Sequence, residues 1–480
     1  MQLSKVKSKF SVFFFLFLFS LFSIFLFDEC LAQEAQKSPK DKAEKKDPAL
    51  DQYYVANAAF NRKLYPVAAG QFESFLEKHP KHPKADLATQ GLALSLYALK
   101  QFDKAMPHLE VLLAKEEIDS TISRERLVML LGQCLMISEK KSDAKNLFIK
   151  EIKIIKDQAY RVAALAAICD VSFNEKNWEE VESWADQLVS SKPNPEGLAR
   201  GLYQQGYAKY QLKKTNEAIR SLSAISQLEA NKLWSTRANY LLGECYNILK
   251  DYAKAEISFL AALPGLGKPE STECHYRLGV TRFVLKKYTD AIENLSTYLK
   301  DQPEGKHARE AAFYIARGNL ENEEYEGSGA SFALLSEGDG LIAAQASLWQ
   351  ARVFTRSEKD YDKASEILSD ALERFSDSNI VTDIRYDLAN SLMGKKNPDW
   401  KSALALLIEV EKDEGFKQLA ELTNQKSVCQ HRLSDYEGSL TSTNEYIKNF
   451  PNTNLFQDAL FLKSENLFLL KRTEEAALAY

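Results

Sequence analysis

Small and aromatic residues recur along the chain in one fixed pattern. A first small residue is followed nine positions later by an aromatic residue and, three positions after that, by a second small residue, as in Gly243, Tyr252 and Ala255. The second small residue recurs at intervals of 36 to 39 residues. A period kept over eleven intervals predicts a repeat architecture of twelve similar units. The second small residues are Ala68, Ala105, Ala144, Val181, Ala218, Ala255, Ala291, Ser328, Ala364, Ala403, Ser439 and Ala476.

Helix packing explains why the first position of the pattern is also small. Two antiparallel helices that pack closely need small side chains where their axes approach, so each unit is predicted to carry one on both helices. The ninth and tenth units have one or two extra residues before the aromatic position, which predicts longer turns there. The first small residues are Ala56, Ala93, Gly132, Cys169, Gly206, Gly243, Gly279, Ala316, Ala351, Ala389, Ser427 and Ser464.

The aromatic position is predicted to open the second helix of each unit and to fill the corner of the hairpin. Apolar residues after it follow the spacing of one helix face, as in Ala291, Leu295 and Tyr298. Each unit is therefore predicted to be a helix, a short turn and a second helix. In several units a proline ends the second helix. The departures from an aromatic residue are Lys141, Thr215 and Thr473, and the terminating prolines are Pro80, Pro193, Pro303 and Pro451.

With these residues, the chain resembles the tetratricopeptide repeat (TPR) family over residues 49–480. Leu242-Gly243-x-x-Tyr246 is similar to the core of that family's first helix, and Ala255-x-x-x-Phe259 to the core of its second. The resemblance implies an all-α fold, a right-handed superhelical solenoid of about twelve antiparallel helix-turn-helix repeats. It also implies that the partners are other proteins or peptides, without saying which.

Two further details of the repeats bear on this resemblance. A period longer than the usual 34 residues, and endings such as Asn449-Phe450-Pro451-Asn452, are similar to bacterial envelope TPR proteins of the outer-membrane-assembly and Tol-Pal type. The fourth and eleventh units depart most from the family pattern, with Val181 and Ala185 in one and Thr443 in the other.

The N-terminal segment has the pattern of an export signal. Three lysines precede an apolar run from Val12 to Phe27, and small residues at Cys30 and Ala32 suit cleavage after Ala32. Residues 1–32 are therefore predicted to be a signal peptide, and residues 33–48, which lack large apolar side chains, a charged flexible linker. An uncleaved membrane anchor is the alternative, because residues 10–27 reach the lower length limit of a spanning helix. Both interpretations place the rest of the chain in the periplasm or cell envelope.

Composition and charge narrow the class of protein. Hydrophobic residues make up 45% and charged residues 27% of the 480 residues, as in soluble globular proteins. Only 19 glycines and 13 prolines occur, which favours helices. The formal net charge is -5, and lysine and arginine form no stripe, so we expect no nucleic-acid partner. After residue 48 the composition does not change, which argues against a second type of domain.

No catalytic or cofactor-binding constellation is evident in the sequence. The six histidines lie in different units or loops, and prolines interrupt the H-x-x-H pair His79 and His82, so we expect neither a catalytic pairing nor a metal site. Cys134, Cys245 and Cys429 share one register, which is typical of buried small side chains. The single sequon, at Asn294, falls inside a predicted helix and favours a bacterial source. We therefore expect a protein that is not an enzyme and has no cofactor.

The remaining candidate site is the face of the first helices, which the resemblance places on the concave side of the solenoid. In units five to eight this face carries tyrosine and arginine, the residue types that dominate binding interfaces. Tyr203, Tyr207 and Tyr210 share one stripe of a helix. These side chains are predicted either to line a peptide-binding groove or to pack against the next unit, and tyrosine suits both roles. The candidate residues are Arg200, Tyr203, Tyr207, Tyr210, Arg237, Tyr240, Glu244, Tyr276, Phe283, Phe313 and Arg317.

Two functional hypotheses follow. The leading one is a non-catalytic envelope scaffold that binds protein segments on the concave first-helix surface. The alternative is a TPR arm of a larger protein, with an enzymatic or membrane domain beyond residue 480. It arises because the last repeat is predicted to be incomplete, leaving four residues partly uncovered. These residues are Leu467, Leu469, Leu478 and Tyr480.

Overall fold

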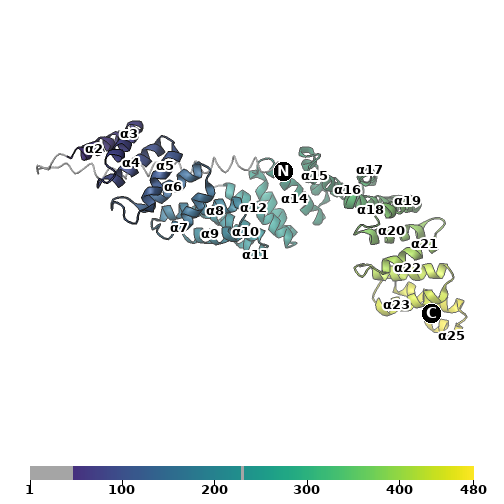
Figure 1. The fold of residues 1–480 in the computed structure, drawn as a ribbon. Coiled ribbons are helices and arrows are strands. Elements are labelled where there is room, and N and C mark those ends of the chain that lie inside the picture. The colour runs from purple at the N-terminus through teal and green to yellow at the C-terminus, as the bar shows by residue number, and fades with distance from the viewer. Residues whose placement is uncertain (1–46, 229–231) are drawn as a thin grey trace. The chain divides into compact units, whose positions relative to one another are not determined.

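The computed structural model describes residues 47–228 and 232–480. The predicted signal peptide and most of the predicted linker lie outside these residues. Within the described ranges the chain forms 24 α-helices and two short 3₁₀ turns, and it has no strand (Figure 1). Consecutive helices pack in pairs, so the predicted all-α fold of twelve helical hairpins is confirmed.

The chain divides into two compact units, one reaching to Ser235 and the other starting at Thr236, within helix α12. The first unit contains five hairpins and the 3₁₀ turn η1 (Ile225–Gln227). Their helices are α2 (Pro48–Asn61) with α3 (Tyr65–Lys78), α4 (Ala85–Ala98) with α5 (Phe102–Ala114), α6 (Arg124–Ile137) with α7 (Lys141–Glu151), α8 (Gln158–Glu175) with α9 (Trp178–Ser190), and α10 (Pro195–Gln211) with α11 (Thr215–Ala224).

The second unit contains most of α12 with its partner helix α13, six further hairpins and the 3₁₀ turn η2 (Leu263–Gly265). No helix in the described residues is both long enough and apolar enough to cross a bilayer. The helices are α12 (Lys232–Ile248) with α13 (Tyr252–Ala262), α14 (Glu270–Val284) with α15 (Tyr288–Asp301), α16 (Ala308–Glu321) with α17 (Tyr325–Ser336), α18 (Gly340–Ser357) with α19 (Tyr361–Arg374), α20 (Val381–Gly394) with α21 (Trp400–Glu411), α22 (Leu419–Arg432) with α23 (Tyr436–Asn449), and α24 (Phe456–Leu469) with α25 (Thr473–Ala479).

The predicted helix boundaries agree closely with the structure. All twelve second helices begin at the aromatic position, including the three in which that position is lysine or threonine. The four second helices with a terminating proline end two or three residues before it, as α15 does before Pro303. The first helix begins at Pro48, one residue before the predicted boundary, because the Asp47 carboxylate caps it by accepting from the Ala49 N–H at 3.0 Å.

In five hairpins the aromatic residue at the predicted corner meets a ring from the end of the first helix. The ring centroids of Phe60 and Tyr65 lie 5.5 Å apart, edge to face, and those of Phe173 and Trp178 lie 5.4 Å apart in the same geometry. Such edge contacts suit the charge distribution of aromatic rings. The prediction that these side chains fill the hairpin corner is confirmed in these hairpins.

The turn inside the hairpin was not predictable from the pattern. In eleven of the twelve described hairpins, the residue two positions before the second helix is a non-glycine residue in the left-handed region, and eight of these are lysine. At Lys250, φ is 60°, its N–H donates to the Asn247 carbonyl, and the next N–H donates to the Tyr246 carbonyl. This pair of bonds satisfies carbonyls at the helix end, which offsets the backbone strain. The tenth hairpin, with its longer turn before Trp400, lacks the left-handed residue.

The core follows from the two small residues in each hairpin. All twelve second small residues are at most 2% exposed, and the first small residues are buried as well. Four of the latter are glycines, each facing a large side chain sixteen residues later. A Cβ at Gly132 would lie 2.1 Å from Phe148, and one at Gly243 would lie 2.5 Å from Phe259. At these positions glycine therefore leaves the space that the opposing ring fills.

The fourth hairpin shows the complementary case. Cys169 takes the first small position where other hairpins have glycine, and the residue sixteen positions later is only Ala185. Both side chains are fully buried. The larger side chain on the first helix is therefore compensated by a smaller one on the second helix, which explains this departure from the family pattern.

Polar residues at small positions have partners for their hydroxyl groups. The Ser328 hydroxyl donates to the Ala316 carbonyl at 2.9 Å, and the Ser439 hydroxyl donates to the Ser427 carbonyl at 2.8 Å. Thr443, which departs from the apolar pattern, donates to the Ser439 carbonyl at 2.6 Å. These bonds allow buried serine and threonine where alanine or leucine is usual.

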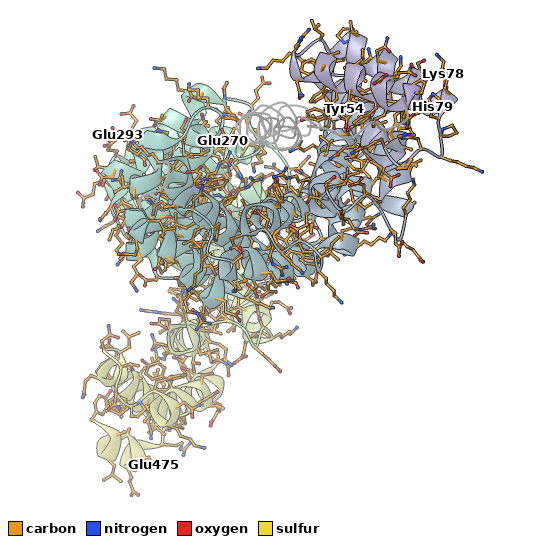
Figure 2. All side chains as sticks on the ribbon, turned by 90° about the vertical axis from the view of Figure 1, so that its left-hand side faces the viewer. Tyr54, Lys78, His79, Glu270, Glu293 and Glu475 are labelled. Atoms are coloured by element: carbon orange, nitrogen blue, oxygen red, sulfur yellow. The ribbon has the colours of Figure 1, made fainter. Side chains whose placement is uncertain are left out.

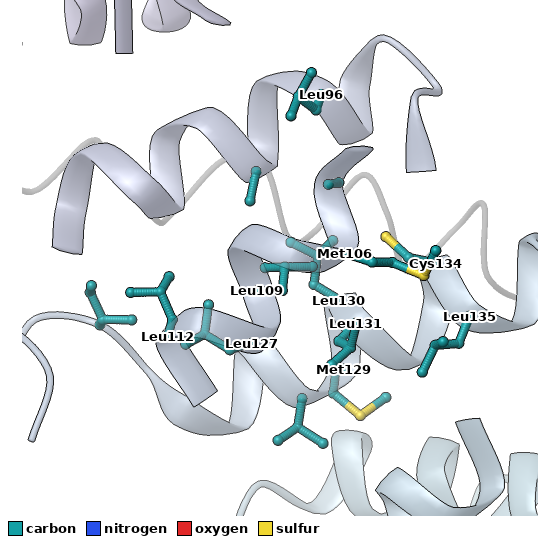
Figure 3. Close-up of a cluster of buried hydrophobic side chains, with 14 of the residues drawn as sticks. Leu96, Met106, Leu109, Leu112, Leu127, Met129, Leu130, Leu131, Cys134 and Leu135 are labelled. Carbon is teal, nitrogen blue, oxygen red and sulfur yellow. The ribbon is translucent and has the colours of Figure 1, made fainter. Parts of the chain in front are cut away.

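Apolar contacts also join neighbouring hairpins. Figure 3 shows Leu96 of α4, Met106 and Leu109 of α5, and Leu127 and Leu131 of α6 in one cluster. This cluster continues from Ala49 to Leu188, so the core of the first unit extends through successive hairpins.

One expectation about the last hairpin is wrong. Leu467 is only 2% exposed, because it packs with Leu440 of the preceding hairpin and Ala476 of its own. Leu469, Leu478 and Tyr480 are exposed by 42%, 89% and 65%, as predicted.

Candidate functional site

The first-helix surface consists of the candidate side chains on the first helices and the groups that contact them. In the first unit it begins on α10, whose N-terminus is capped by Asn194 accepting from the Gly197 N–H at 2.8 Å. Arg200 forms an ion pair with Asp170 of α8, and Gln204 donates to the same carboxylate at 2.7 Å. Burial lowers the pKa of Arg200 to about 10. This charged group therefore joins two neighbouring first helices.

Aromatic side chains continue the surface along α10. The Tyr207 ring lies 4.9 Å from Phe173 of α8 and 5.4 Å from Trp178 of α9. Tyr203 lies 6.1 Å from Tyr207 and 5.6 Å from Trp234, and Tyr210 lies 6.4 Å from Tyr207. The three tyrosines are half-buried, so each both contacts other rings and keeps part of its surface exposed.

In the second unit the candidate surface begins on α12. Tyr240 is half-buried, with its ring centroid 5.8 Å from Phe259, whereas Arg237 is exposed. Glu244 forms an ion pair with Arg277 of α14, with 3.4 Å between Oε1 and Nε. Burial raises the pKa of Glu244, and the Arg277 charge opposes this shift.

Two of the eleven candidates are core residues. Tyr276 is 3% exposed and stacks on His307, the N-cap residue of α16, with ring centroids 4.1 Å apart and planes inclined by 8°. Phe313 is 7% exposed and lies 5.8 Å from Phe332. Tyr276 and Phe313 therefore pack inside the array instead of lining a groove, and they offer little surface to a ligand.

The last two candidates lead to residues that the sequence did not single out. Phe283 lies 5.0 Å from Tyr314, and its ring is 5.6 Å from the Arg317 guanidinium carbon. The same guanidinium lies 3.2 Å from the centre of the Trp349 ring on α18. Arg352 and Arg356 approach this ring too, at 4.4 and 5.7 Å. Trp349, Arg352 and Arg356 all lie on α18, so the surface extends beyond the eighth hairpin into the ninth.

A register rule connects these contacts. The residue directly after the first small residue of one hairpin contacts the residue two positions before the first small residue of the next. This rule explains how the same face holds neighbouring hairpins together, and it identifies Arg352 as the equivalent of Arg317. The pairs are Asp170 with Gln204, Glu244 with Arg277, Arg317 with Trp349, and Arg352 with Asp387.

The other groups considered for chemistry are in structural positions. The five cysteines of the described residues are buried free thiols, and burial raises the pKa of each to about 12, so they are poor thiolate sources. His79, at the end of α3 (Figure 2), lies beside Phe75, whereas the His82 Nε2 is 3.0 Å from the Asp47 carboxylate. No cluster of three His, Cys, Asp or Glu side chains in residues 47–228 or 232–480 is arranged to hold a metal ion.

The fold and this surface define a helical-hairpin repeat protein. Residues 56–119 and 203–270 match the family model described as tetratricopeptide repeat. The other hairpins keep the same register of small residues and helix starts. No curated protein matches the sequence.

Several solved structures are similar over much of their length. The apo form of the quorum sensor NprR from B. thuringiensis is 12% identical, covers 68% of this chain and 98% of its own, and has a TM-score of 0.43. Yeast Tom70 is 14% identical, covers 90% of this chain and 100% of its own, and has a TM-score of 0.35. A tetratricopeptide repeat protein from Parabacteroides merdae is 14% identical, covers 63% of this chain and 98% of its own, and has a TM-score of 0.30. Identities and TM-scores this low say nothing about a shared function.

Proposed function

We propose that the chain is a non-catalytic protein-interaction scaffold of the cell envelope that binds protein segments on its first-helix surface. Tetratricopeptide repeats generally bind other proteins or peptides, which supports the class of partner. The observation that carries the proposal is the stripe of half-buried tyrosines on α10, Tyr203, Tyr207 and Tyr210. Neighbouring rings hold these side chains in place, so a partner that buries them loses little side-chain entropy.

The geometry suits an extended or helical peptide better than a small molecule. The tyrosines follow the axis of α10 at positions i, i+4 and i+7, which gives a linear stripe. Linear stripes of aromatic side chains match the spaced anchor residues of a bound peptide. Tyrosine also supplies a hydroxyl at the rim of such a contact, where hydrogen bonds to the partner backbone can form.

Comparative capture from the native cell tests the binding surface. The Tyr203→Ser, Tyr210→Ser double variant removes two half-buried rings but keeps Tyr207, which packs on Phe173 and Trp178. The matched control is Asn216→Ser with Arg220→Ser, on the exposed face of the second helix α11. After chemical crosslinking in cells, the wild type and the control are expected to recover the same envelope proteins, and the tyrosine variant to lose them. Equal recovery by both variants, or no recovery by the wild type, would contradict the proposal.

The envelope location is supported by the signal-like pattern of residues 1–32 and needs a separate test. We expect alkaline phosphatase fused after residue 48 to be active in a bacterial host, since this enzyme folds only where disulfides form. A fusion without residues 1–32 is expected to be inactive. Equal activity of the two fusions would sink the proposed location and leave the binding surface untouched.

A further inference from the structure

Three arginine side chains converge on one indole ring in the second unit. The guanidinium carbons of Arg317, Arg352 and Arg356 lie 3.2, 4.4 and 5.7 Å from the centre of the Trp349 ring. Trp349 is itself packed against the apolar cluster that contains Phe313. The ring is therefore fixed, and the stacked cations gain from its negative face while their positions are restricted.

The carboxylates within ion-pair distance of this arginine cluster number two, against three guanidinium groups. Glu321 lies 3.3 Å from Arg317 and 3.8 Å from Arg356, and Asp387 lies 2.5 Å from Arg352. Elsewhere on the first-helix surface the ratio of carboxylates to arginines is higher. The single arginine Arg277 has two carboxylates, those of Glu244 and Glu273, within ion-pair distance. Among residues 236–480, three guanidinium groups of the arginine cluster thus share two carboxylates within ion-pair distance.

The hydrogen-bonding capacity of the cluster is also largely unused. A guanidinium carries five N–H donors. Within the second unit, these three groups make two hydrogen bonds to protein, from Arg317 to Glu321 and from Arg352 to Asp387. The Arg317 Nε is buried without a hydrogen-bond partner. An anionic group that binds here would find donors already oriented and would not have to displace protein acceptors.

Exposure increases outward across the cluster. The side chains of Arg317, Arg352 and Arg356 are 19%, 27% and 46% exposed. Burial lowers the pKa of Arg317, and the charges of Arg352 and Arg356 act in the same direction. Asp383 of α20 also lies near Arg352: burial raises the pKa of this carboxyl, and the Arg352 charge opposes that shift.

We propose that the arginine cluster around Trp349 binds an acidic segment of a partner protein. The carboxylates of that segment accept hydrogen bonds from Arg352 and Arg356 in bidentate geometry, and its apolar side chains contact the exposed part of the indole. This inference rests on the proposed scaffold function and names the chemistry of one part of the partner.

Selection from a random peptide library tests the inference directly, because the library covers acidic, basic and apolar segments alike. The probe is a library of phage-displayed dodecapeptides, applied to the full-length chain. The test variant is Arg352→Gln with Arg356→Gln, which keeps Arg317 and Trp349. The control variant, Lys396→Gln with Lys401→Gln, removes the same charge from exposed positions near the turn before α21. Circular dichroism of each variant establishes that the helices are intact.

The selected peptides are expected to be enriched in aspartate and glutamate, and their binding to weaken as salt concentration rises. The strongest peptide should bind the arginine variant at least about tenfold more weakly, as expected for loss of charged anchor residues, and the lysine variant with little change. An Arg352→Lys, Arg356→Lys variant should recover only part of the affinity, because lysine cannot form the bidentate contact.

Three outcomes would overturn the inference: no enrichment, enrichment of peptides that are not acidic, or equal binding by the arginine and lysine variants. Its failure is distinguishable from failure of the scaffold proposal. If only the arginine-cluster inference fails, the Tyr203→Ser, Tyr210→Ser variant still loses envelope partners in cells. If the scaffold proposal fails, that variant recovers them.

Discussion

At the residue scale, the stability of each hairpin depends on matching the size of two facing side chains. Where the second helix presents phenylalanine or leucine, the first helix has glycine or alanine, and where it presents Ala185, the first helix can hold Cys169. The space for a side chain at one position is therefore set by the residue sixteen positions later. Single substitutions at these positions have predictable signs.

Gly243→Ala is expected to destabilise the chain by about 1–3 kcal/mol, because the new methyl group would overlap the Phe259 ring. Gly327→Ala is the control: it lies in α17 with open space around the added methyl, and should stabilise by up to about 1 kcal/mol through helix propensity. Urea unfolding measures both. Adding Phe259→Leu to Gly243→Ala should recover part of the loss, and an unchanged loss would show that the ring is not the cause.

Glu256 is expected to make stability depend on pH. Its carboxylate is buried, which raises its pKa, but hydrogen bonds from Lys287 at 2.6 Å and Arg282 at 3.0 Å outweigh burial and hold the pKa below its ordinary 4.5. A depressed acid pKa stabilises the fold above the unfolded value, and this contribution disappears as the pH falls through the folded value. The stability difference between wild type and Glu256→Gln should therefore be largest near about pH 7 and shrink toward about pH 3. A difference that stays constant over this range would contradict the assignment.

At the element scale, the hairpin turn combines a strained residue with satisfied backbone groups. Lys286 has a φ of 61°, and the N–H groups of Lys286 and Lys287 close the end of α14. The pattern of the sequence predicted where each second helix starts, because the spacing of small residues fixes the contact point of the two helices. It did not predict the left-handed turn residue, since lysine has no intrinsic preference for that region.

Lys286→Gly is expected to stabilise the chain by about 0.5–1 kcal/mol, since glycine adopts the left-handed region without strain. Glu293→Gly, at an exposed site in the middle of α15, should instead cost about 1 kcal/mol. Thermal unfolding of the two variants gives the comparison. A destabilised Lys286→Gly protein would mean that the lysine side chain itself supports the turn.

The candidate surface was less predictable than the elements. Periodicity placed Tyr203, Tyr207 and Tyr210 on one stripe, and the structure keeps them there half-buried. It did not separate them from Tyr276 and Phe313, which are core residues, because the burial of an aromatic side chain depends on the neighbouring hairpin. The register of Arg317 extends to Arg352, so that residue was accessible from the sequence. Trp349 and Arg356 hold different positions and emerge only from the packing of α16 against α18.

At the scale of the whole molecule, the hairpins within each of the two units pack mainly against their neighbours in sequence. Stability in such arrays is close to a sum of hairpin terms and nearest-neighbour terms. The effect of a core substitution should therefore stay local within the chain.

Phe148→Ala removes a fully buried ring in the third hairpin and should cost about 3–5 kcal/mol locally. Hydrogen exchange followed by mass spectrometry should show faster exchange in α5 to α8 and unchanged exchange in α20 to α23. Faster exchange throughout the chain would mean that the array unfolds as one cooperative block.

The central claim is that protein segments bind to the first helices and not to the second. Site-specific photo-crosslinking in the native cell tests it most directly, with a photoreactive residue placed in turn at Tyr203, Tyr210, Asn216 and Arg220. The scaffold account predicts crosslinks to partner proteins from Tyr203 and Tyr210 on α10, and few or none from Asn216 and Arg220 on α11. Partner crosslinks that are equal at all four positions, or that concentrate on α11, would contradict it.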